Sequence, residues 1–137
     1  AWKWSEKPGQ PPASRIGLLT HDAARYADEL WWREARPELV MGPGSWGWIA
    51  AAFASIGLLD RPGILEGVET PVLILGTTAD RLVEFGAIAR AARRLPHAEL
   101  LRFGAESRHE ILRETDPVRD AALAAIDAFL DRAAPAA

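Results

Sequence analysis

The residues best suited to chemistry in this 137-residue chain are an aspartate and a histidine in two loops near its C-terminal end. Asp80 follows the apolar run at residues 71–76, and His109 follows a second short predicted strand at residues 99–103. A carboxylate can accept a hydrogen bond from one imidazole nitrogen and fix the tautomer, while the other nitrogen takes a proton from a nucleophile. The order, aspartate before histidine, is typical of hydrolases whose nucleophile comes earlier in the chain.

Each of these two residues also has an ordinary structural interpretation. Asp80 precedes a predicted helix, which an aspartate side chain could simply cap. A single loop histidine such as His109 is commonly exposed to solvent and does no chemistry. From the residues alone, both the structural and the catalytic interpretation stay open.

Four other titratable residues are weaker candidates. His97 separates a helix from the following strand, so we expect it at the opposite end of the sheet from the ligand-binding edge. His21 falls in the first turn of a predicted helix and is expected on the surface. Glu110 and Glu114 are expected to orient or cap their neighbours, without reacting themselves.

The elements that must position Asp80 and His109 form a regular series. A continuous apolar run at 71–76 is typical of a strand buried on both faces of a parallel sheet. A helix is predicted at about 83–95, a second strand at 99–103, and a last helix from Asp116, which has proline at its first helical position. This series predicts an α/β fold with parallel strands joined by a right-handed crossover. Because two such strands would leave an edge and a face exposed, we expect the C-terminal portion of a larger sheet, incomplete on its own.

The residues before this series divide into a leader and a helical segment. Residues 1–17 are expected to be an irregular leader, residues 18–62 a helical lid or cap, and residues 63–137 part of the α/β core. Within the lid we expect a helix at 21–35 with Thr20 as its N-cap. Apolar residues recur at helical spacing in residues 48–58, and a glycine-rich turn at 42–44 joins the two helices.

All six tryptophans lie in the first 48 residues. Indole rings suit the boundary between an apolar surface and water. Trp31, Trp46 and Trp48 are therefore candidates to contact an acyl chain, and Trp32 could join them. The alternative is that these side chains only pack the lid against the rest of the protein.

Composition excludes several other classes of function. A net charge of −3 at pH 7 does not indicate a nucleic-acid surface, and the absence of cysteine excludes a disulfide scaffold and a thiolate metal site. Three scattered histidines suggest no metal centre. No apolar stretch approaches the roughly 20 residues that cross a bilayer. We therefore expect no cofactor or metal, no nucleic-acid partner and no transmembrane segment.

Three stretches carry a resemblance to a known family. PVLILGTTADRLV (71–83) and SRHEILRETDPVRDAALAAIDAFL (107–130) resemble the C-terminal end of α/β-hydrolase-fold serine hydrolases, and particularly the lysophospholipase and monoacylglycerol lipase group. LTHDAARYADELWWREARPELVMGPGSWGWIAAAF (19–53) is similar to the lid of that group. The resemblance covers residues 18–132 and implies that Asp80 is the acid and His109 the general base of a Ser-His-Asp triad.

One feature of that family is missing from the chain, because no G-x-S-x-G nucleophile motif occurs in it. The nearest match, at residues 43–47, replaces the first glycine by proline, and the resemblance places its Ser45 in the lid. The expectation is therefore a carboxylic ester hydrolase acting on a small ester or lipid, whose serine lies outside this chain. Such a chain needs the N-terminal part of the hydrolase core or a partner chain. The alternative is a non-catalytic fragment or a lipid- or partner-binding module.

Overall fold

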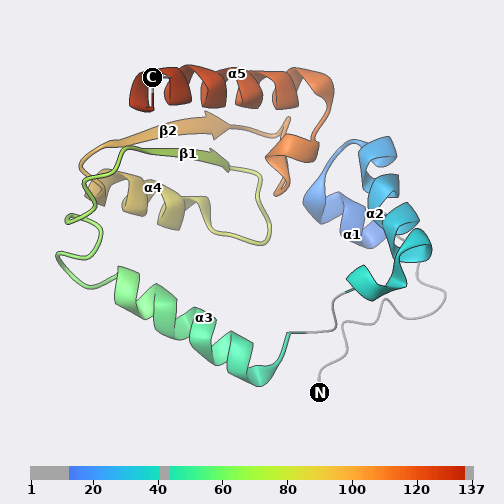
Figure 1. Ribbon diagram of the computed structural model, residues 1–137, viewed down its shortest axis with the longest axis horizontal. Coiled ribbons are helices and arrows are strands. Elements are labelled where there is room, and N and C mark those ends of the chain that lie inside the picture. The colour runs from blue at the N-terminus through green and yellow to red at the C-terminus, as the bar shows by residue number, and fades with distance from the viewer. Residues whose placement is uncertain (1–12, 41–43, 135–137) are drawn as a thin grey trace.

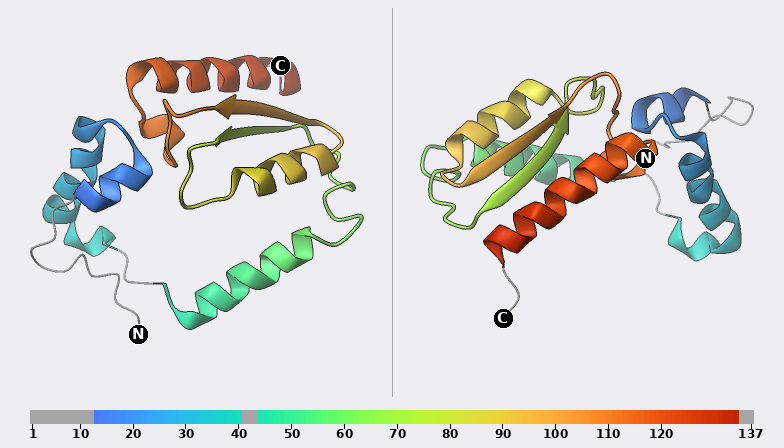
Figure 2. Two further views of the ribbon diagram at one scale, coloured as in Figure 1. Left: turned by 180° about the vertical axis from the view of Figure 1, so that it is seen from behind. Right: turned by 90° about the horizontal axis from the view of Figure 1, so that it is seen from above.

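The computed structural model describes residues 13–40 and 44–134 of the chain (Figure 1). Its centre is a parallel two-stranded sheet, in which Val72 lies opposite Ala98 and Thr77 opposite Phe103. One helix covers each face of the sheet, so the unit has three layers (Figures 1 and 2). In chain order, the elements of this α/β unit are β1 (Val72–Thr77), α4 (Phe85–Arg94), β2 (Ala98–Phe103) and α5 (Asp116–Ala133).

This order confirms the predicted strand–helix–strand–helix series and the α/β class. The strand boundaries differ from the prediction by one residue, and α4 is shorter than expected at its N-terminal end. At the start of α5 the N-cap is Thr115, whereas Asp116 was expected there. Asp116 instead occupies the first helical turn, where its charge also suits the helix dipole.

The core of the α/β unit lies between the sheet and α5. Phe103, Val118 and Ala122 are buried there, with part-buried side chains packed around them, namely Leu75, Leu101 and Ile111. On the other face, Gly76 allows close approach of α4, because a Cβ at this position would lie 3.3 Å from the Phe85 ring. Small residues at the contact therefore set the distance between sheet and helices.

The prediction that the first strand is buried on both faces holds only at its end. Gly76 and Thr77 are buried, whereas residues 72–75 are half-buried. Within the described residues the sheet has two strands, so one edge of β1 is left without a neighbouring strand. This open edge accounts for the partial exposure.

The N-terminal part is helical and contains two elements that the sequence did not predict, a short first helix and a 3-10 turn. Its elements are α1 (Ala13–Leu19), α2 (Ala23–Ala35), the 3-10 turn η1 (Pro37–Leu39) and α3 (Trp46–Leu59). The expectation of an irregular leader over residues 1–17 was wrong for residues 13–17, which belong to α1. Tertiary contacts stabilise this short helix, including an ion pair of 2.6 Å between Arg15 and Glu29. The rest of the leader, residues 1–12, lies outside the described residues.

Of two local predictions for residues 18–62, the one for the N-cap of α2 was wrong and the one for the turn at residues 42–44 stays a prediction. The N-cap of α2 is Asp22, whose carboxylate accepts the Arg25 N–H at 2.9 Å, and not Thr20. Thr20 is fully buried, and its hydroxyl donates to the Arg113 carbonyl at 2.7 Å and accepts the Asp22 N–H at 2.9 Å, so it binds the residue before the helix and not an N–H of the first turn. The predicted turn at residues 42–44 lies largely outside the described residues.

Helix α3 has an unusual position in the structure. It carries no charged residue and yet buries no side chain. Its N-cap is Ser45, and its C-terminal end is held by Arg94 of α4, which donates to the carbonyls of Leu59 at 2.8 Å and Arg61 at 2.7 Å. In Figure 1 the helix runs below α4, separated from the sheet.

Candidate functional site

Asp80 and His109 lie together beyond the carboxyl ends of the two strands. The loop after β1 carries the aspartate and the loop after β2 carries the histidine, and parallel strands bring these loops to the same edge. Nδ1 of His109 lies 2.8 Å from Oδ2 of Asp80, so the hydrogen bond expected from the sequence is present. The Asp80 side chain is 6% exposed and the His109 side chain 36% exposed.

The two carboxylate oxygens of Asp80 have different partners. Oδ1 accepts the backbone N–H groups of Leu82 at 2.7 Å and Val83 at 3.0 Å, which stabilises the turn before α4. Oδ2 is left to His109. The structural and the catalytic interpretation of this aspartate are therefore compatible, because local capping aims the second oxygen at the imidazole.

The ionisation of Asp80 determines which histidine tautomer is present. Burial by itself would raise the pKa of the Asp80 carboxyl, but the hydrogen bonds from His109, Leu82 and Val83 outweigh it and hold that pKa below its ordinary value. An ionised carboxylate can only accept hydrogen bonds, so Nδ1 of His109 must carry the proton. In neutral His109, Nε2 is then unprotonated and can act as a base.

A buried threonine joins the two loops. The Thr77 hydroxyl lies 2.9 Å from the Gly104 carbonyl and 3.1 Å from the Ser107 carbonyl, and it accepts the Ala79 N–H at 3.1 Å. Thr77 is 1% exposed. Sequence reasoning missed this residue, although a polar side chain at the end of an apolar strand was a possible signal.

The backbone around His109 also pairs with the end of α1. The Glu110 N–H donates to the Leu19 carbonyl at 2.8 Å, and the His109 N–H reaches the Leu18 carbonyl at 3.4 Å. The Arg108 guanidinium donates to the Thr20 carbonyl at 2.8 Å. Residues 16–22, which span the end of α1 and the turn before α2, therefore form one wall of the histidine loop.

Glu114 and His21 belong to this wall as well. Glu114 is fully buried, and its carboxylate contacts Nδ1 of His21 at 3.0 Å. The sequence assigned Glu114 an orienting or capping role, which agrees with these contacts. His21 is exposed, as expected, but it precedes α2 and does not lie in the helix, and its ring contacts the Glu114 carboxylate.

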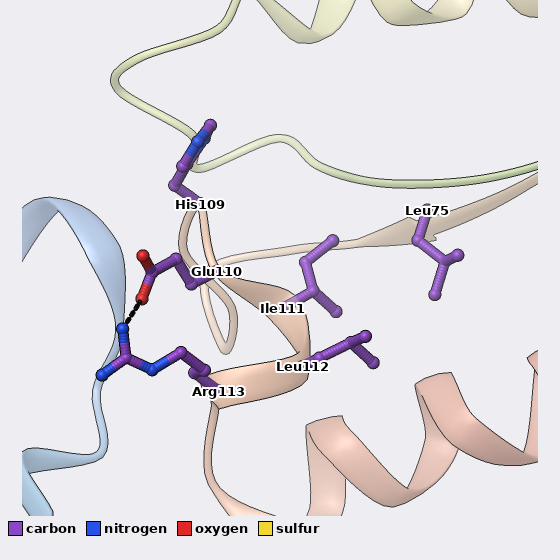
Figure 3. A pocket seen from close by; sticks show the side chains of 6 residues that line it. All are labelled: Leu75, His109, Glu110, Ile111, Leu112 and Arg113. Atoms are coloured by element: carbon purple, nitrogen blue, oxygen red, sulfur yellow. Dashed lines mark hydrogen bonds and ion pairs between the residues drawn. The ribbon is translucent and has the colours of Figure 1, made fainter. Parts of the chain in front are cut away.

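An open, mostly apolar hollow lies beside His109 (Figure 3). Leu75, Ile111 and Leu112 line it, and the imidazole of His109 points away from their side chains. At its other side Glu110 accepts from Arg113 at 2.8 Å, drawn as the dashed line in Figure 3. The site thus places a polar pair next to an apolar surface.

The remaining candidates lie apart from this pair. Ser45 uses its hydroxyl to accept the Trp48 N–H at 3.1 Å, and among the side chains that the structure describes no serine hydroxyl hydrogen-bonds His109. Trp31, Trp46 and Trp48 are 58%, 71% and 67% exposed, so none packs into the interior of the described chain. Trp31 stacks edge-to-face on Trp32, with ring centroids 4.8 Å apart.

The described residues contain no cluster of three or more histidine, cysteine, aspartate or glutamate side chains able to hold a metal ion. In the same residues, none of the helices has the length and apolar character needed to cross a bilayer.

Comparison with known proteins relates the fold to a lipase. Neither a protein-family model nor a curated protein sequence matches the chain. A solved structure of a soluble variant of monoglyceride lipase from Saccharomyces cerevisiae, in complex with a substrate analog, matches it with a TM-score of 0.66 and 22% sequence identity. The match covers 85% of this chain and 41% of the lipase chain, so the chain spans about two fifths of the lipase's length. The chain has the fold of a portion of an α/β hydrolase.

Proposed function

We propose that this chain supplies the acid and the general base of a carboxylic ester hydrolase, with Asp80 as the acid and His109 as the base. The observation that carries the proposal is the 2.8 Å hydrogen bond between Asp80 and Nδ1 of His109, formed by two loops at one edge of a parallel sheet. The α/β-hydrolase fold supports it, because that fold presents its catalytic loops at this edge. We assign the nucleophile to a serine outside these 137 residues.

In the proposed reaction, Nε2 of His109 takes the proton from the serine hydroxyl as its oxygen attacks the ester carbonyl. The tetrahedral intermediate collapses when the carbon–oxygen bond to the alcohol breaks and the imidazolium returns the proton to that alcohol. Water then attacks the acyl-enzyme with the same general-base assistance and releases the carboxylic acid. Asp80 stabilises the imidazolium and keeps Nδ1 protonated throughout.

The proposed substrates are monoacylglycerol-like or lysophospholipid-like esters. Two observations favour an apolar acyl chain, namely the apolar hollow beside His109 and the exposed tryptophans at positions 31, 46 and 48. The lipase to which the fold is similar was solved with a substrate analog. We assign the three tryptophans to a lid surface that contacts the acyl chain.

The proposal is tested by turnover of the intact enzyme, including the segment or partner that supplies the serine. His109→Ala should remove nearly all ester hydrolysis. Asp80→Asn should lower kcat by about 10⁴-fold, because the amide favours the wrong imidazole tautomer. His97→Ala is the matched control, since His97 is exposed and lies at the amino end of β2.

The control variant should retain full turnover, and each variant's melting temperature should confirm that it is folded. Wild-type turnover in folded His109→Ala would refute the assignment. So would a wild-type protein, complete with its other parts, that binds esters without hydrolysing them, and that result would favour a binding module.

A further inference from the structure

The least exposed acidic side chain of the described residues lies close to the proposed base. Glu114 is 0% exposed, although a buried carboxylate is costly unless hydrogen bonds replace its water. Four N–H groups reach it. Oε1 faces the Arg108 N–H at 2.8 Å and Nδ1 of His21 at 3.0 Å, and Oε2 faces the His21 N–H at 3.0 Å and the Thr115 N–H at 3.4 Å.

One of these donors belongs to the residue directly before His109. Because a peptide group is planar, holding the Arg108 N–H fixes the orientation of the peptide between Ser107 and Arg108. On the other side of Arg108, its carbonyl, which belongs to the peptide that enters His109, accepts the Ser107 hydroxyl at 3.2 Å. Both peptide groups of Arg108, the second of which leads into His109, are therefore restrained.

Two of the other donors connect Glu114 to the segment directly before α2. His21 is 93 residues away in sequence, yet it gives the carboxylate both its backbone N–H and its ring nitrogen. The His21 side chain is 34% exposed, whereas Glu114 is inaccessible. His21 thus contacts the carboxylate from the solvent side. The carboxylate in turn holds the loop that carries His109 from the protein interior.

We infer that Glu114 is a positioning residue for His109, which holds the base in line with Asp80 through the Arg108 peptide, and that His21 aims Glu114. This inference rests on the proposed function, because it assigns a purpose to the restraint of His109. It adds a second histidine–carboxylate pair to the site, and this pair supports the first one without contacting substrate. The lid segment and the base are thereby linked through one buried carboxylate.

Glu114→Gln is the informative substitution. It preserves shape, but it replaces one acceptor oxygen by an amide nitrogen. Whichever way the amide turns, one of the backbone N–H groups, that of Arg108 or that of His21, faces a donor and loses its acceptor. Glu99→Gln is the matched control, since Glu99 lies on β2, is exposed, and its carboxylate pairs with Arg132 of α5.

Two readouts separate positioning from general stability in the intact enzyme. Misplacement of a catalytic group by about 1 Å can lower turnover about 100-fold, so Glu114→Gln should lower kcat by roughly 10- to 100-fold while KM changes less than about twofold. The proton resonance of His109 Nδ1–H, shifted downfield by its bond to Asp80, should move upfield or broaden in the same variant. Glu99→Gln should change neither quantity.

The outcomes are distinguishable from failure of the proposed function. If His109→Ala retains activity, the proposed function fails and the inference fails with it. If His109→Ala is inactive but folded Glu114→Gln keeps both its kcat and its His109 resonance, the positioning role alone is overturned. Should Glu114→Gln not fold, His21→Ala replaces it, because the exposed ring can be removed without opening the core. It should lower kcat severalfold and shift the His109 resonance, and wild-type values of both would overturn the inference.

Discussion

The α/β unit and helix α3 use apolar residues in opposite ways. In the unit, Phe103 is 7% exposed and packs on Val118 and Ala122. In α3, Phe53 is 69% exposed and Trp46 71% exposed, although the helix has no charged residue. Apolar composition therefore does not decide burial by itself. The unit is organised by contacts among its own layers, whereas α3 is defined by a local cap at one end and a tether to Arg94 at the other.

The same substitution in the two regions should have very different effects on stability. Phe103→Ala removes a buried ring and should lower the free energy of unfolding by about 3–5 kcal/mol. Phe53→Ala removes an exposed ring and should change it by no more than about 0.5 kcal/mol. Urea denaturation of both variants, followed by circular dichroism, measures the difference.

A large loss of unfolding free energy in Phe53→Ala would contradict the exposed position of this ring. If that variant lost more than about 2 kcal/mol, its ring would have to be buried in the protein under test. Helix α3 would then pack against a surface outside the described residues. If Phe103→Ala and Phe53→Ala both lost little unfolding free energy, that result would instead contradict the core described for the α/β unit.

Glycine-to-alanine substitutions should differ in sign between the two regions. At Gly76 a new Cβ would lie 3.3 Å from the Phe85 ring and 3.4 Å from Ile88, and we expect this crowding to destabilise the protein by roughly 1 kcal/mol. At Gly57, within α3, a new Cβ meets no atom within 4 Å, so alanine should stabilise the helix by about 0.5–1 kcal/mol. Melting temperatures of the two variants should shift in opposite directions. A decrease for Gly57→Ala would show that its open side is occupied.

The exposed tryptophans of α3 should affect substrate choice more than stability. If an acyl chain covers about 60 Å² of indole, the contact is worth about 1.5 kcal/mol, or about tenfold in kcat/KM. Trp46→Ala and Trp48→Ala should therefore reduce hydrolysis of long-chain esters about tenfold and spare short-chain esters. The test is kcat/KM over an acyl-length series, with Phe53→Ala as an exposed aromatic control on the same helix. Equal losses at every length, accompanied by a lower melting temperature, would assign these rings to packing.

The sequence predicted the α/β unit well because its signals are local. An apolar run between Pro71 and Gly76 defines β1, and proline in the first turn marks the start of α5. Once two parallel strands were expected, the rule that their carboxyl ends share an edge brought Asp80 and His109 together. The residues alone left their pairing open, and the resemblance to α/β hydrolases implied it.

The features that the sequence did not predict depend on long-range contacts. Thr20 was expected to cap the helix, but its hydroxyl donates to the Arg113 carbonyl, 93 residues later, and accepts from the Asp22 N–H, and Asp22 caps the helix instead. The burial of Glu114 and its pairing with His21 arise in the same way. Helix α1 forms where no pattern indicated it, because its residues gain partners in α2 and in the histidine loop.

The central claim is that the Asp80–His109 pair activates a serine that lies outside this chain. Labelling of the intact enzyme with a fluorophosphonate, followed by mass spectrometric identification of the modified residue, tests it most directly. We expect one labelled serine outside residues 1–137. Labelling should be lost in His109→Ala and retained in both His97→Ala and Ser45→Ala. Labelling of Ser45, or labelling that persists in folded His109→Ala, would contradict it.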